Sequence, residues 1–117
     1  MKIKTLSPLL VLAFAASIIA QGVSFTATEA AKHVGETTTI TGTVDGVHQS
    51  GKDNIFLNIG GTYPNQAFTA FIPSASAAQF PNPRHYEGRT VSVFGKISLY
   101  KGKPEIIVNS PSQISVK

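Results

Sequence analysis

The sequence predicts one small, mainly β domain whose strands close into a barrel. Three observations predict this fold class. Apolar and polar residues alternate over five short stretches, which is the pattern of half-buried strands. The two longest stretches carry glycine in their interior, where a sheet can bend or bulge. A segment of small residues separates the first three stretches from the last two, and it suits a short helix.

The five expected strands cover residues 37–47, 55–59, 67–72, 90–100 and 105–109, and a short edge piece is expected at 113–116. Period-2 alternation assigns one set of side chains to the core. This set is Ile40, Val44, Ile55, Leu57, Ile59, Phe68, Ala70, Ile72, Val91, Val93, Ile97 and Leu99. By the same parity Phe56 and Phe71 fall on the opposite face, outside the expected core.

Two helices are expected, both short. Thr26 and Glu29 have the spacing of a capping box, so a helix should begin there and continue to His33, with Gly35 ending it. Residues 74–80 suit a second short helix between strands three and four, which the prolines at 81 and 83 should end.

Three strands, a helix and two further strands is the order of the five-stranded OB-type Greek-key barrel. In that barrel the helix fills the gap between strands three and four. A small open β-sandwich is the alternative that the same strand pattern allows.

The N-terminus reads differently from the rest of the chain. A short basic start precedes an uncharged apolar stretch from Leu9 to Ala20 (apart from Ser17), which is the pattern of a signal peptide. We therefore expect residues 1–22 to be a signal peptide and residues 23–117 to be the OB-type domain. The product should be periplasmic or secreted, with no stable membrane insertion after cleavage. An uncleaved membrane anchor is the alternative.

Charge alone is weak support for a polyanionic partner. The whole chain has a formal charge of +4, and without Lys2 and Lys4 it is only +2. The distribution is more informative, because six basic and two acidic residues lie from Arg84 onward. The chain has no cysteine, which excludes disulfides and thiolate metal sites.

Three runs suggest a family: 56–60 (FLNIG), 63–69 (YPNQAFT) and 86–104 (YEGRTVSVFGKISLYKGKP). The chain from about Ala30 to Val116 resembles the OB-fold modules of exported bacterial proteins, which stand alone or are fused to secreted nucleases. The resemblance implies a nucleic-acid-binding module, an expectation that rests on the fold, and fold alone does not fix function. It implies no catalytic role, because the nuclease domain of the fused proteins is missing from this sequence.

We expect a binding module for single-stranded nucleic acid (DNA or RNA) or another extended anion. A single nucleic-acid strand needs flat side chains for bases and cations for phosphates. The candidate stacking residues are Phe56, Tyr63, Phe71 and Tyr100, and the candidate phosphate-binding residues are Lys52, Lys96, Lys101 and Lys103. Structural alternatives exist for most of them. Phe56 and Phe71 could pack under the N-terminal helix, Tyr63 could brace its turn, and the lysines at 101 and 103 could simply solubilise a hairpin tip.

Catalysis has little support in the sequence, so we expect no enzyme activity, no cofactor and no metal. The histidines lack metal-ligand spacing. A metal-dependent nuclease would have to use the scattered residues Asp45, Asp53, Arg84, Glu87 and Arg89. The main alternative function is a module that binds a protein, an oligosaccharide or another small ligand in the bacterial envelope.

Overall fold

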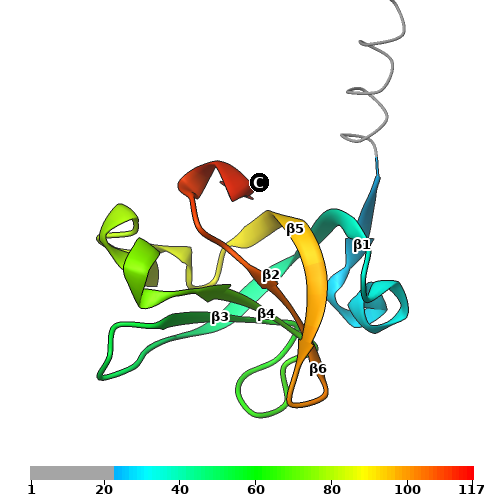
Figure 1. Cartoon of the computed structure of the whole chain (residues 1–117), viewed down its shortest axis with the longest axis horizontal. Coiled ribbons are helices and arrows are strands. Elements are labelled where there is room, and N and C mark those ends of the chain that lie inside the picture. The colour runs from blue at the N-terminus through cyan, green and yellow to red at the C-terminus, as the bar shows by residue number, and fades with distance from the viewer. Residues whose placement is uncertain (1–22) are drawn as a thin grey trace, which may run out of the picture.

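The computed structural model describes residues 23–117 (Figure 1), so the predicted signal peptide lies outside the described residues. The strands are β1 (Ser24–Thr26), β2 (Thr37–Gln49), β3 (Ile55–Ile59), β4 (Phe68–Ile72), β5 (Thr90–Tyr100), β6 (Lys103–Ile107) and β7 (Ile114–Val116). Short 3₁₀ helices are η2 (Ala27–His33), η3 (Ser74–Gln79), η4 (Pro83–Tyr86) and η5 (Pro111–Gln113). None of the helices in this part of the chain is long and apolar enough to cross a membrane.

Five of the strands are hydrogen-bonded in a closed cycle. The order β2-β3-β4-β6-β5 returns to β2, because the first half of β2 pairs with β5 while its second half pairs with β3. All pairings in this cycle are antiparallel except β4 with β6. The mainly β, OB-like prediction is therefore confirmed. The sheet has seven strands, because β7 corresponds to the edge piece expected at 113–116 and β1 is an additional strand that was not expected.

Local irregularities let the long strands curve. The register of β2 against β3 shifts between Val44 and Gly46, so Asp45 is an extra residue and Val47 returns to the core side. Gly42 lies so close to Ile59 that an added Cβ would stand 2.6 Å from its Cγ2 atom. A side chain at this position would have to displace a buried isoleucine, which explains the glycine inside a strand.

The core lies inside the cycle of strands. Its fully buried large side chains are Phe68, Ile40, Ile55, Leu57, Ile59, Ile72, Ile97, Ile106, Val44, Val91, Val93 and Val108. All but one of the predicted core residues are buried. Leu99 is 55% exposed, because it pairs with Pro104 near the end of the β5–β6 hairpin, beyond the closed part of the barrel.

The helices differ from the prediction in kind and number. The capping box is present, with the Thr26 amide donating to Glu29 Oε1 at 2.8 Å, but η2 is a 3₁₀ helix. The single helix expected between strands three and four is two 3₁₀ helices, because Pro83 begins η4 where we expected only an ending. With seven and six residues, η2 and η3 are too short to form stable α-helices on their own.

The N-terminal helix closes one part of the core. Ala27 and Ala30 of η2 are buried in the core cluster, and Ala27 lies against Gly42 and Gly60. This overturns the alternative in which η2 covers Phe56 and Phe71. Gly42 and Gly60 leave the room that Ala27 occupies.

Candidate functional site

A row of mostly aromatic side chains crosses the outer face of β2, β3, β4 and β6. His48 pairs in register with Phe56, Phe56 with Phe71, and Phe71 with Ile107. The rings of Phe56 and Phe71 have centroids 5.2 Å apart, and those of His48 and Phe56 are 5.8 Å apart. Neighbouring strands thus place an apolar stripe on the outside of the barrel.

A polar row lies beside the aromatic one. Asn58 pairs with Thr69, Thr69 with Glu105, and Glu105 with Ser98. Asn58 and Thr69 are buried, and the Gln66 side chain donates from Nε2 to Thr69 Oγ1 at 3.2 Å. The β3–β4 loop therefore covers one end of this row and leaves Glu105 at the open end.

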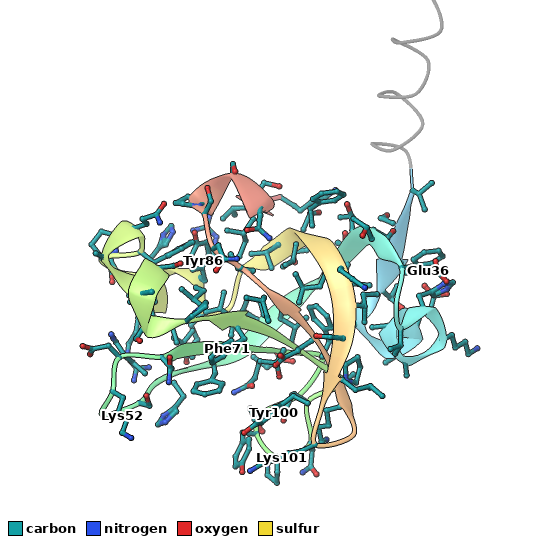
Figure 2. All side chains as sticks on the ribbon, in the orientation of Figure 1. Glu36, Lys52, Phe71, Tyr86, Tyr100 and Lys101 are labelled. Atoms are coloured by element: carbon teal, nitrogen blue, oxygen red, sulfur yellow. The ribbon has the colours of Figure 1, made fainter. Side chains whose placement is uncertain are left out.

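The two rows border a shallow hollow of about 160 Å³, which is lined by Asn54, Phe56, Phe71, Tyr100 and Glu105. The two phenylalanines are half-buried, whereas Tyr100 is 56% exposed. Figure 2 shows Phe71 between Lys52 at one end of this side and Tyr100 with Lys101 at the other. The structure thus joins three of the four predicted stacking residues in one surface.

The Glu105 carboxyl is an unusual lining group for such a surface. Burial raises its pKa above the ordinary value of 4.5, and desolvation is the only cause of that shift. Neither ion pair among residues 23–117 involves Glu105. A partly desolvated carboxyl that has no ionic partner within residues 23–117 therefore lines the hollow.

The predicted lysines occupy different places around the hollow. Lys52 is exposed at the tip of the β2–β3 loop, and its amide donates to Ser50 Oγ at 3.3 Å. Lys101 is exposed in the β5–β6 turn with its ammonium 5.3 Å from the centre of the Tyr100 ring. Lys96 is also exposed, but it pairs with Thr37 of β2 and does not line the hollow.

Lys103 joins two loops. Its Nζ donates to the carbonyl oxygens of Pro64 at 2.8 Å and Gln66 at 3.3 Å, so two of its three ammonium hydrogens are used. The β3–β4 loop consequently lies beside the β5–β6 hairpin (Figure 1). Tyr63 in that loop is 76% exposed and does not line the hollow.

Sequence reasoning missed four residues of this face: His48, Asn54, Glu105 and Ile107. The signal for Glu105 and Ile107 was available, because they alternate with the buried Ile106 and Val108. His48 was assigned to a loop, but β2 continues to Gln49. Asn54 also has a structural role, since its Oδ1 accepts a hydrogen bond from the Ser74 amide at 2.8 Å.

A larger hollow of about 260 Å³ lies elsewhere and is lined by Gln79, Phe80, Pro81, Asn82, His85 and Tyr86. All these residues come from one continuous connection, so this hollow is a crease between η3 and η4. Within residues 23–117 no three His, Asp or Glu side chains are grouped so that they could hold a metal ion.

Comparisons with known proteins show the fold. The chain shares it with segments of two tRNA synthetase types. An aspartyl-tRNA synthetase from Entamoeba histolytica matches with a TM-score of 0.55 and 18% identity, over 85% of this chain and 22% of the enzyme. An asparaginyl-tRNA synthetase from the same organism matches with a TM-score of 0.53 and 16% identity, over 81% of this chain and 23% of the enzyme. A protein described as an aspartyl-tRNA synthetase from Leishmania major Friedlin matches with a TM-score of 0.53 and 13% identity, over 80% of this chain and 20% of that protein.

This chain spans only about a fifth of the length of these enzymes, so the likeness concerns one of their parts. Comparison with protein-family models and with curated sequences gives no match. The resemblance to exported bacterial modules is not tested by these structures and stays a prediction.

Proposed function

We propose that the protein binds single-stranded nucleic acid on the outer face of β3, β4 and β6. The observation that carries this proposal is the hollow in which Phe56, Phe71 and Tyr100 meet. It lies on the strand pair, and between the two loops, that OB barrels use for oligonucleotides and oligosaccharides. Here those loops are Ser50–Asn54 and Lys101–Gly102, and each presents an exposed lysine.

The chemistry of this face suits a flexible anionic strand. Each base has a flat apolar surface, and stacking on an aromatic side chain contributes about 1–3 kcal/mol. Lys52 and Lys101 flank the rings and can neutralise phosphates on either side. The related folds belong to enzymes whose names state that they act on tRNA, which is compatible with this proposal but shows only the fold.

A second candidate is an envelope module for an oligosaccharide or another small ligand. Glu105 favours it, because a carboxylate in the hollow repels phosphate. The modest charge of the part after residue 22 also agrees with this alternative. Binding that does not weaken with salt would support it over nucleic acid.

We further propose that the protein is exported and non-catalytic. The support for export is the signal-peptide pattern of residues 1–22, and the support for a purely binding role is the lack of a recognisable catalytic motif. Sequencing the N-terminus of the protein recovered from the periplasm or medium tests export. An uncut N-terminus in the membrane fraction would contradict it.

The test of binding is a fluorescence-anisotropy titration of the purified protein with labelled ten-nucleotide DNA and RNA. We expect affinity to fall about sevenfold between roughly 50 and 200 mM salt if two phosphates are contacted. Phe71→Ala should weaken binding by roughly five- to 100-fold. Phe94→Ala is the matched control, because Phe94 is 43% exposed on β5 opposite Thr39, away from the hollow.

Absence of binding at low salt would refute the nucleic-acid proposal. Equal losses in the two phenylalanine variants would place the site elsewhere. Near-ultraviolet circular dichroism of both variants checks that the barrel is retained.

A further inference from the structure

The charge of the proposed site does not match a surface that binds only phosphates and base faces. Glu105 lies between Ser98 and Thr69 in register and lines the hollow together with Phe71 and Tyr100. Its carboxylate is partly desolvated and has no cationic partner among the described residues. A ligand that covers the hollow would remove the remaining water from this carboxylate, which is costly unless the ligand donates hydrogen bonds to it.

A bound single strand offers such donors on its base edges and, in RNA, as the single O–H of each ribose 2′-hydroxyl. Phosphate and ribose ring oxygens are acceptors, so they cannot satisfy a carboxylate. Adenine and cytosine each offer an amino group, but a ring nitrogen that accepts lies directly beside it. Uracil and thymine offer one N–H between two carbonyl oxygens. Guanine alone presents two adjacent donors, the ring N1–H and the 2-amino group, which match the two oxygens of a carboxylate.

We propose that Glu105 makes this face selective for guanine in a single strand. This inference rests on the proposed function. The base stacks on the aromatic rings that line the hollow, and its Watson–Crick edge donates both hydrogens to the Glu105 carboxylate. Charge-assisted pairs of this kind are stronger than neutral hydrogen bonds. Because a base without the donors would leave the carboxylate unpaired, the site should also reject other bases.

The test compares three ten-nucleotide DNA strands that differ at one central position. The first contains thymine throughout, the second has one guanine, and the third has hypoxanthine, which keeps N1–H but lacks the 2-amino group. We expect the guanine strand to bind about tenfold more tightly than the thymine strand. The hypoxanthine strand should lose most of that gain.

Variants of the protein then assign the preference to Glu105. Glu105→Gln should bring the guanine-to-thymine affinity ratio close to one, mainly because the guanine strand binds more weakly. Glu87→Gln is the charge-matched control, because Glu87 is exposed and pairs with Arg84 at 3.3 Å. It should keep the full preference.

The outcomes separate the two proposals. Equal affinity of the native protein for all three strands would overturn the guanine inference and leave nucleic-acid binding standing. Binding of none of the strands would overturn both. Retained guanine preference in Glu105→Gln would also refute the role of this carboxylate.

Discussion

Replacing Glu105 by glutamine should stabilise the unbound protein at neutral pH. Burial raises the pKa of this carboxyl in the folded state, so folding disfavours its charged form. The folded state then binds more protons than the unfolded chain between the two pKa values. Relative to high pH, this extra proton binding stabilises the folded state. The stabilisation is fully present below the ordinary pKa of 4.5 and is lost as pH rises through the pKa of Glu105 in the folded state. At pH 7 the whole penalty applies.

The size of this penalty is limited by solvent. Glu105 is only half-buried, so the penalty must be discounted to less than about 1 kcal/mol. For a domain of this size, about 0.5 kcal/mol corresponds to a rise in Tm of roughly 2–4 °C. Thermal unfolding of native protein and Glu105→Gln, followed by circular dichroism at pH 7 and pH 3.5, measures the difference. All other titrating groups cancel in that comparison.

Two results would refute this reasoning. A lower Tm of the variant at pH 7 would mean that Glu105 makes a favourable contact in the folded state. An equal rise in Tm of the variant at pH 3.5 would mean that the effect does not come from the charge of Glu105.

Four further predictions follow from the geometry. Lys101→Ala should make the negative slope of log affinity against log salt concentration shallower by about 0.7, because one phosphate contact is lost. Lys32→Ala on η2 should not change this slope. Gly42→Ala should lower the free energy of unfolding by about 1–3 kcal/mol in urea titrations, because the added methyl would displace Ile59. Lys103→Met should speed amide hydrogen exchange in the β3–β4 loop, since two anchoring hydrogen bonds are lost. Glu29→Gln should lower Tm at pH 7 but not at acidic pH, because the Thr26 hydrogen bonds lower the pKa of Glu29 and favour its charged form.

Alternation was sufficient to predict the strands whose two faces differ clearly. Residues 55–59 form a strand with the expected bounds, because Ile55, Leu57 and Ile59 all reach the core. The prediction was wrong for Leu99, since period-2 patterning assigns a side to a residue but does not tell where the barrel ends. It also missed β1, whose three residues carry too short a pattern to detect.

The candidate site was predictable in part. Outward parity identified Phe56 and Phe71, and the turn composition placed Lys101 beside Tyr100. The role of Lys103 could not be predicted, because its two carbonyl partners lie 37 and 39 positions away along the chain. Such contacts depend on the order of strands in the sheet, which the local pattern of a single sequence does not show.

The short strands β1 and β7 have a consequence for strand pairing between molecules. Each lies at an end of the sheet order, and each contains only three residues. The long strands β2 and β5 are paired on both sides at these places, so their backbone groups offer little to a strand from another molecule. A three-residue edge is too short to template a stable intermolecular sheet. The short edges of this sheet therefore limit edge-to-edge pairing between molecules.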